Sequence, residues 1–185
     1  MLSHCRKYHR LYLSMLFMVS LIPLTGCNMA WADEASSIIK LLIPAIQAAL
    51  AILSGLGAMA TDVDRWGVKA TNDLSTVEKL IELFKTAAED AKAGILSEIQ
   101  QVLLNIATDL NSLMPRINSV SADVQKIFQS ILIELQALVG AVPVLSGVVT
   151  NPDEAKRLLN RVQSAQEFKK SFNKATAKFG AQYKL

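Results

Sequence analysis

The 185-residue chain carries a small excess of positive charge, with 19 Lys and Arg against 16 Asp and Glu. This balance is unlike the strongly basic composition of nucleic-acid-binding domains, so we expect no nucleic acid partner. The two histidines and two cysteines all lie within the first 27 residues: His4, His9, Cys5 and Cys27. Residues 28–185 therefore lack the side chains of Ser-His-Asp and Cys-His triads and of zinc sites. The composition predicts a protein that is not an enzyme and that uses no cofactor.

The opening segment has the layout of an export signal: a basic stretch, an apolar run over residues 11–24, and then small residues. Its end, Leu24-Thr25-Gly26-Cys27, resembles the lipobox of bacterial membrane lipoproteins. The resemblance implies that residues 1–26 are a lipoprotein signal peptide and that Cys27 becomes the acylated residue anchored in a lipid bilayer. It also implies a place in the bacterial cell envelope. The outer membrane is expected, because Asn28 stands where an aspartate often marks inner-membrane retention.

A second cleavage site competes with the lipobox. Ala30-Trp31-Ala32 has the small-x-small form of an ordinary secretory site. Cleavage after Ala32 would leave a soluble periplasmic protein without a lipid anchor. A cysteine at the end of an apolar run is much rarer by chance than two alanines, so the lipobox is the preferred interpretation.

Downstream of the signal, residues 27–35 are expected to form the lipidated cysteine and a short linker, and residues 36–185 a single helical domain. Alanine, leucine and isoleucine dominate and aromatic residues make up 6%, which favours helices over strands. The first predicted helix covers residues 36–61 and bends near Pro44. Residues 61–71 then read as a loop, because Asp62, Asp64 and Gly67 are common in turns.

The same loop contains a weak candidate for a metal site. Asp62, Asp64, Gly67 and Asp73 occupy positions 1, 3, 6 and 12 of a calcium-binding loop. Trp66 stands at position 5, however, and the final glutamate is missing. The preferred interpretation is therefore a polar interhelical loop without a metal, in which Trp66 covers one end of the core.

An apolar seam predicts a long helical hairpin over residues 74–138. Apolar residues recur there at spacings of three, four or seven, with a slip of one position at Ile99: Leu74, Val77, Ile81, Phe84, Ala88, Ala91, Ile95, Val102, Ile106, Leu113, Ile117, Val120, Val124, Ile127, Ile131 and Leu138. This period of about seven favours antiparallel helices wound about each other. We divide the segment into a helix over 72–113, a turn or kink at Pro115, and a helix that ends near Val139. The seam can also pair between chains, so a homo-oligomer remains an alternative.

The last predicted helix runs from residue 151 to about 178. Asn151, Pro152, Asp153 and Glu154 form a strong helix start, with an N-cap, a proline at the first position and acidic residues in the first turn. Residues 156–185 carry eight basic side chains and one acidic, whereas residues 33–155 carry 15 acidic and eight basic. Lys170, Lys174 and Lys178 share one face and are candidates for contact with an anionic surface. The alternative is that this segment neutralises the acidic part of its own fold.

Together these elements predict an all-α bundle of about four helices. No charged residue occurs from Leu41 to Ala60, and only Glu134 is charged from Ile127 to Thr150. Each segment is therefore either a core helix or a membrane-inserting one, and core burial is preferred. We expect a structural, scaffolding or binding role with an unidentified protein partner. The alternatives are a membrane-active, pore-forming protein and a carrier of a lipid or other apolar ligand.

Overall fold

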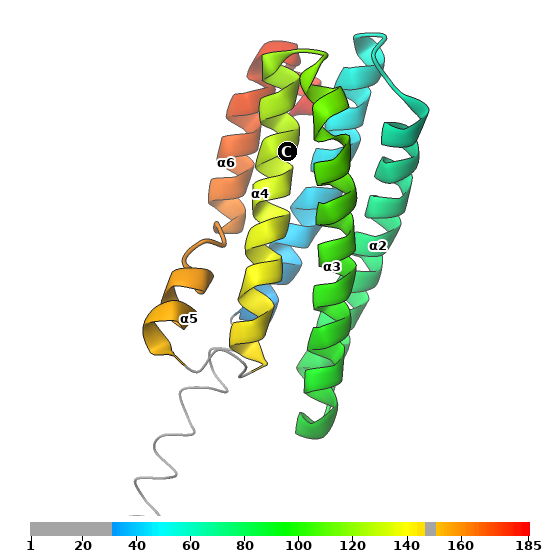
Figure 1. The fold of residues 1–185 in the computed structure, drawn as a ribbon. Helices are drawn as coiled ribbons and strands as arrows, with labels where there is room; N and C mark the ends of the chain where they lie inside the picture. Colours follow the sequence, from blue (N-terminus) through cyan, green and yellow to red (C-terminus); the bar gives the residue numbers. More distant parts are fainter. Residues whose placement is uncertain (1–30, 147–150) are drawn as a thin grey trace, which may run out of the picture.

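The computed structural model describes residues 31–146 and 151–185, and all regular elements in these ranges are helices. This confirms the predicted all-α bundle. Four long helices form it: α1 (Trp31–Gly55), α2 (Thr61–Thr86), α3 (Glu89–Asn118) and α4 (Ala122–Leu145). Two shorter helices, α5 (Pro152–Leu159) and α6 (Ala165–Thr176), pack along α4 (Figure 1). Two single 3₁₀ turns follow them, η1 (Ala177–Phe179) and η2 (Ala181–Tyr183).

Interhelical ion pairs show how neighbouring helices run. Two pairs bridge each of two interfaces: Asp33–Lys85 and Lys40–Glu78 between α1 and α2, and Asp62–Arg116 and Lys69–Asp109 between α2 and α3. On each interface, a step of seven residues forward on one helix matches a step of seven residues back on the other. The helices are therefore antiparallel and keep a constant register over two turns.

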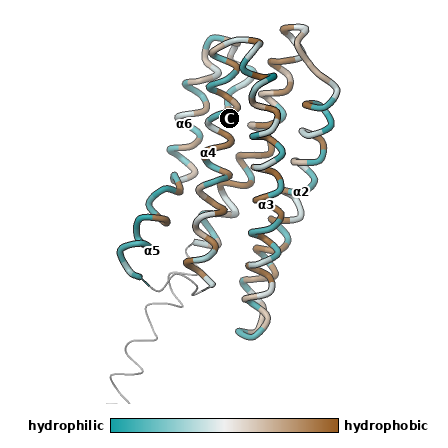
Figure 2. Tube along the Cα trace, viewed as in Figure 1, coloured by the Kyte–Doolittle hydropathy of each residue, from teal (hydrophilic) through white to brown (hydrophobic). Residues whose placement is uncertain are grey.

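The apolar seam contributes part of the buried face of α2, α3 and α4. Figure 2 shows hydrophobic positions along the inner side of the helices and hydrophilic ones outside. The buried seam residues include Leu74, Val77, Ile81, Phe84, Ile99, Ile106, Ile117, Val124, Ile127, Ile131 and Leu138. Ala88 and Ala91, which the sequence placed in the same seam, are exposed. The seam fails there because α2 ends at Thr86 and α3 begins at Glu89, so the predicted single helix over 72–113 is wrong.

The predicted loop over 61–71 is also wrong, because these residues form the first part of α2. Asp62 and Asp64 lie in its first turn, where a negative charge favours the helix dipole. Gly67 is buried, and a Cβ at this position would collide with the side chain of Leu50 on α1. The glycine thus serves close packing between two helices rather than a turn.

Pro115, which was expected to mark a turn or kink, lies inside a helix, as does Pro143. Pro115 is in the last turn of α3, which continues to Asn118, and Pro143 is in the last turn of α4. A proline near a helix end removes few intrahelical bonds, so it need not stop the helix at once. The next helix, α4, begins at Ala122. The Ser121 side chain caps it by accepting a hydrogen bond of 3.1 Å from the Val124 backbone N–H.

The last predicted helix has the expected start but is divided in two. The Asn151 side chain accepts hydrogen bonds from the backbone N–H groups of Asp153 and Glu154, at 3.0 and 3.4 Å. The chain then leaves the helix after Leu159 and restarts at Ala165. Ser164 and Glu167 form a capping box at this second start, which the sequence analysis overlooked. The expected single helix over 151–178 is therefore α5, a turn and α6.

Among the described helices, α1 and α4 are long and apolar enough to cross a membrane, judged by length and composition alone. Both are nevertheless packed into the bundle, and each leaves a narrow exposed stripe. On α1 the stripe holds Asp33, Ser37, Lys40, Gln47, Ala51 and Ser54; on α4 it holds Ala122, Lys126, Gln129, Ile133 and Gln136. Each stripe is mostly polar, as on a core helix with one side facing water.

Candidate functional site

The predicted anchor residue, Cys27, and the signal segment 1–26 lie outside the described residues. The structure does describe residues 31–35 of the segment expected to be a linker. These residues are helical, and Trp31, Ala32 and Ala35 belong to the hydrophobic core. The folded bundle thus extends to within four residues of Cys27 in the sequence.

The second cleavage site coincides with core residues. Trp31 is 8% exposed and Ala32 fully buried, both in α1. Cleavage after Ala32 would remove an aromatic side chain and one end of a core helix from the folded domain. The structure thus gives Trp31 and Ala32 a packing role in α1.

The three candidate metal-binding aspartates do not converge. Asp62 pairs with Arg116 of α3, whereas Asp64 and Asp73 border an open hollow along α2. Asp62 and Asp73 lie on one straight helix and are separated by about 16 Å along its axis, which is too far to share one ion. In residues 31–146 and 151–185, no group of three or more His, Cys, Asp or Glu side chains could hold a metal ion.

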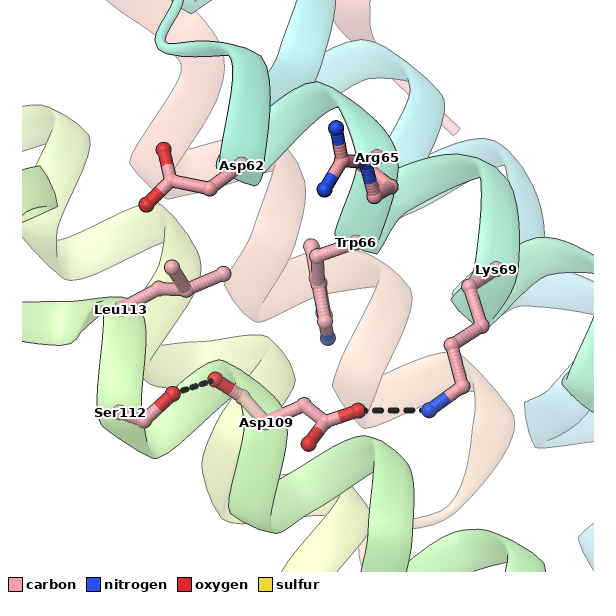
Figure 3. Close-up of a pocket in the computed structure, with 7 residues that line it drawn as sticks. All are labelled: Asp62, Arg65, Trp66, Lys69, Asp109, Ser112 and Leu113. Atoms are coloured by element: carbon pink, nitrogen blue, oxygen red, sulfur yellow. Dashed lines mark hydrogen bonds and ion pairs between the residues drawn. The ribbon is translucent and has the colours of Figure 1, made fainter.

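A hollow of about 220 Å³ lies between α2 and α3 (Figure 3). Its walls are Asp62, Arg65, Trp66 and Lys69 from α2 and Asp109, Ser112 and Leu113 from α3. Trp66 is 4% exposed, and its indole Nε1–H donates to the Ile106 carbonyl oxygen at 3.4 Å. Its ring also packs against Phe128, with the ring centroids 6.2 Å apart. Trp66 therefore belongs to the core, and the rest of the wall consists of four charged side chains with Ser112 and Leu113.

Three of the four charged side chains around this hollow, Asp62, Lys69 and Asp109, form ion pairs across the helix interface. Lys69 Nζ lies 2.8 Å from Asp109 Oδ2, and its hydrogen bond to Asp109 raises the pKa of Lys69 above its ordinary value. Both side chains are about half exposed, so the pair contributes little to stability. The geometry of the site is that of an interhelical contact open to water.

The three candidate lysines differ in their surroundings. Lys170 and Lys174 are exposed on α6. Lys178 lies in η1, where its ammonium group pairs with Asp123 in the first turn of α4 and stands 5.3 Å from the ring centre of Phe179. The opposite face of α6 is anchored in the core by Phe168 and Phe172, whose ring centroids are 6.0 Å apart. Here α6 is docked on the bundle with Lys170 and Lys174 directed to solvent.

Sequence reasoning missed the most unusual side chain of the bundle, Glu134. It is 1% exposed on α4, and neither carboxylate oxygen has a hydrogen-bond partner among the described residues. Burial raises the pKa of Glu134 to about 7, and the negative charges of Glu167 and Glu34 add to the shift. The Gln163 backbone N–H opposes the shift, although it does not form a hydrogen bond of good geometry. The available signal was the single charge in the apolar segment from Ile127 to Thr150.

Comparison with known proteins gives no further assignment. The chain matches no family model, no curated protein and no solved structure. Its role is therefore inferred from its own residues and their arrangement.

Proposed function

We propose that this chain is an exported bacterial lipoprotein whose acylated Cys27 tethers a non-enzymatic helical bundle to the cell envelope, at the outer membrane. The observation that carries the proposal is the sequence Leu24-Thr25-Gly26-Cys27 at the end of an apolar run. Each CH₂ group of an acyl chain that is buried in the bilayer stabilises the attachment by about 0.8 kcal/mol, so a cysteine with two or three acyl chains is a lasting anchor.

The burial of Trp31 supports cleavage before Cys27 over cleavage after Ala32. Removal of a buried tryptophan side chain typically costs about 3–5 kcal/mol, a large part of a domain's stability. A mature chain that begins at Cys27 keeps Trp31 and Ala32 in the core, where both are buried. Only residues 28–30 would then separate the anchor from the described part of α1. The bundle would thus be held close to the membrane surface.

The proposed role of the bundle is to present a surface to a protein partner near that membrane. Two of its hollows, along α2 and between α2 and α3, are open and bordered by charged side chains, in keeping with binding or scaffolding rather than catalysis. The exposed residues Lys170 and Lys174 belong to a C-terminal segment with eight basic side chains and one acidic. This segment is the part of the surface best suited to an anionic partner, because it offers a concentration of positive charge.

The anchor is tested by metabolic labelling with palmitate in a bacterial host. The variant Cys27→Ser is compared with Cys5→Ser, which changes the other cysteine of the same segment. We expect label in the parent and in Cys5→Ser, and none in Cys27→Ser. The mass of the N-terminal peptide then identifies the cut, before Cys27 or after Ala32. An unlabelled parent that begins at Asp33 would contradict the proposal.

The second candidate function is insertion into a bilayer. It is favoured by the two helices, α1 and α4, that have the length and composition of membrane spans. The polar side chains of their exposed stripes argue against it, because insertion would bury Lys40 and Lys126 in lipid. Liposome flotation of an unlipidated chain that begins at Asn28 separates the two functions. Salt-resistant binding with dye release would support insertion, and no binding would support a tethered bundle.

A further inference from the structure

Glu134 is a charged residue at a buried position of α4, and its neighbour Ile133 is an apolar residue at an exposed position. The exposed stripe of α4 includes Ile133, which is 49% exposed, while the adjacent Glu134 is 1% exposed. Exchanging these two side chains would place the apolar one in the core and the charged one in water. A buried carboxylate without partners is costly, and such a departure from the local pattern points to a function.

Every charge that acts on Glu134 is negative. Glu34 faces it from α1 and Glu167 from α6, while α2, α3 and α5 contribute no group that shifts its pKa. Gln163, whose backbone amide faces Glu134, has a buried side-chain oxygen that also lacks a hydrogen-bond partner. Loss of the Glu134 proton would therefore create a buried charge, repelled by two carboxylates and compensated by no cation among the described residues.

A short helix near the C-terminus, α6, carries one of the groups that face Glu134. Gln163 lies in the turn before α6, and Glu167 lies in the first turn of α6. That turn is tied to α1 by a hydrogen bond of 2.6 Å from the Ala165 backbone N–H to Glu34 Oε1. Helix α6 is 12 residues long and lies near the C-terminus, whereas α2, α3 and α4 are 24 to 30 residues long. It can leave the bundle without breaking the packing of the long helices.

We propose that Glu134 is a proton-controlled latch: its neutral carboxyl lets α6 dock against α1 and α4, and loss of the proton releases α6 together with the turn that precedes it. The released segment exposes Phe168 and Phe172, which are buried in the docked state. It also carries Lys170 and Lys174 away from the bundle. The latch does not depend on the lipid anchor, so it holds for the chain with or without acylation.

The direction of the pH response follows from the two protonation states. Burial raises the pKa of Glu134 from its ordinary 4.5 to about 7 in the docked state, and release returns it towards the ordinary value. Docking is therefore favoured at low pH and weakens as the pH rises through about 7. Between about pH 6 and pH 8 the released fraction should rise roughly tenfold, because only the docked form changes its protonation over this interval.

The test is hydrogen exchange of the full chain, read by mass spectrometry and corrected for the intrinsic effect of pH. We expect residues 165–176 to open at a lower free energy than α2 and α3, and their protection to fall roughly tenfold from about pH 6 to pH 8. Glu134→Gln should remove this pH dependence. The control Glu98→Gln, at an exposed position on α3, should preserve it. Glu134→Leu provides a second uncharged variant if the glutamine variant fails to fold.

Three results would overturn the proposal. The first is equal protection of α6 in the parent at both pH values, which requires no variant. The second is a pH dependence that persists in Glu134→Gln or Glu134→Leu. The third is exchange of residues 165–176 at the same free energy as α2 and α3, which would mean that the whole bundle, and not α6 alone, opens.

Discussion

Gly67→Ala tests the packing of α1 against α2 directly. A Cβ at position 67 would overlap Leu50 Cδ1 and lie 3.1 Å from Leu50 Cγ. Gly94 on α3 is the matched control, because it is exposed and a Cβ there would meet no atom within 4 Å. Both substitutions replace a helical glycine, so they share the gain in helix propensity and differ in the collision.

The expected magnitudes follow from these two terms. Alanine is favoured over glycine by about 0.8–1 kcal/mol inside a helix, so Gly94→Ala should stabilise the bundle by about that amount. Overpacking of a filled interface costs about 1–3 kcal/mol, which offsets or exceeds the same gain at position 67. We therefore expect Gly67→Ala to be less stable than Gly94→Ala by about 1–3 kcal/mol.

Urea unfolding of the unlipidated chain, followed by far-ultraviolet circular dichroism, gives both free energies. A double-mutant cycle with Leu50→Ala should show a favourable coupling of about 1–3 kcal/mol, since the smaller side chain makes room for the new Cβ. If Gly67→Ala stabilises the protein as much as Gly94→Ala does, with no coupling to Leu50, then α1 does not pack at Gly67 and the reasoning is refuted.

Three further predictions concern other parts of the bundle. The raised pKa of Glu134 means that the folded state holds a proton that the unfolded state releases above about pH 4.5. The free energy of unfolding should thus fall by about 3 kcal/mol from pH 5 to pH 8. Chemical denaturation at the two pH values checks this, and an equal fall in Glu134→Gln would assign the pH dependence to another group. Trp31→Ala should cost about 3–5 kcal/mol in urea unfolding, and a loss below about 0.5 kcal/mol would place Trp31 outside the core. Ser164→Ala removes the capping box with Glu167 and should lower protection of α6 in hydrogen exchange by about 1 kcal/mol; unchanged protection would show that the cap contributes nothing.

The helical class and the core faces could be predicted because they depend on local periodicity. Leu74, Val77, Ile81 and Phe84 recur at helical spacing, and all four are buried. The start of α5 was equally clear, because Asn151 carries its own capping chemistry.

The helix ends were harder to predict where the deciding contact is distant in sequence. Gly67 was assigned to a loop, since its close approach to Leu50 cannot be seen in the residues around it. The break at Ala87 and Ala88 has neither proline nor glycine, and its only local signal is the acidic pair Glu89 and Asp90 at the start of α3. Such positions are decided by tertiary packing rather than by local propensity.

The candidate sites show the same division. Lys170 and Lys174 were placed correctly on an exposed face, because a helical face follows from spacing. The convergence of Glu34, Glu134 and Glu167 joins three helices, so no local pattern could indicate it. The capping box of Ser164 and Glu167 was visible in the sequence and could have separated α5 from α6.

The ion pairs between the long helices also make a wrong alignment unfavourable. On the interface of α1 and α2 the charges alternate in sign at a spacing of seven residues along each helix. Slipping α1 by one heptad in one direction would place Asp33 opposite Glu78. The slip in the other direction would place Lys40 opposite Lys85.

The interface of α2 and α3 follows the same rule. A slip of one heptad would bring Asp62 opposite Asp109 or Lys69 opposite Arg116. An apolar seam with a seven-residue period tolerates such slips, because it presents similar leucines and isoleucines after each step. The surface pairs, although weak in stability, thus distinguish the native alignment from its nearest competitors and direct the folding chain to a single arrangement.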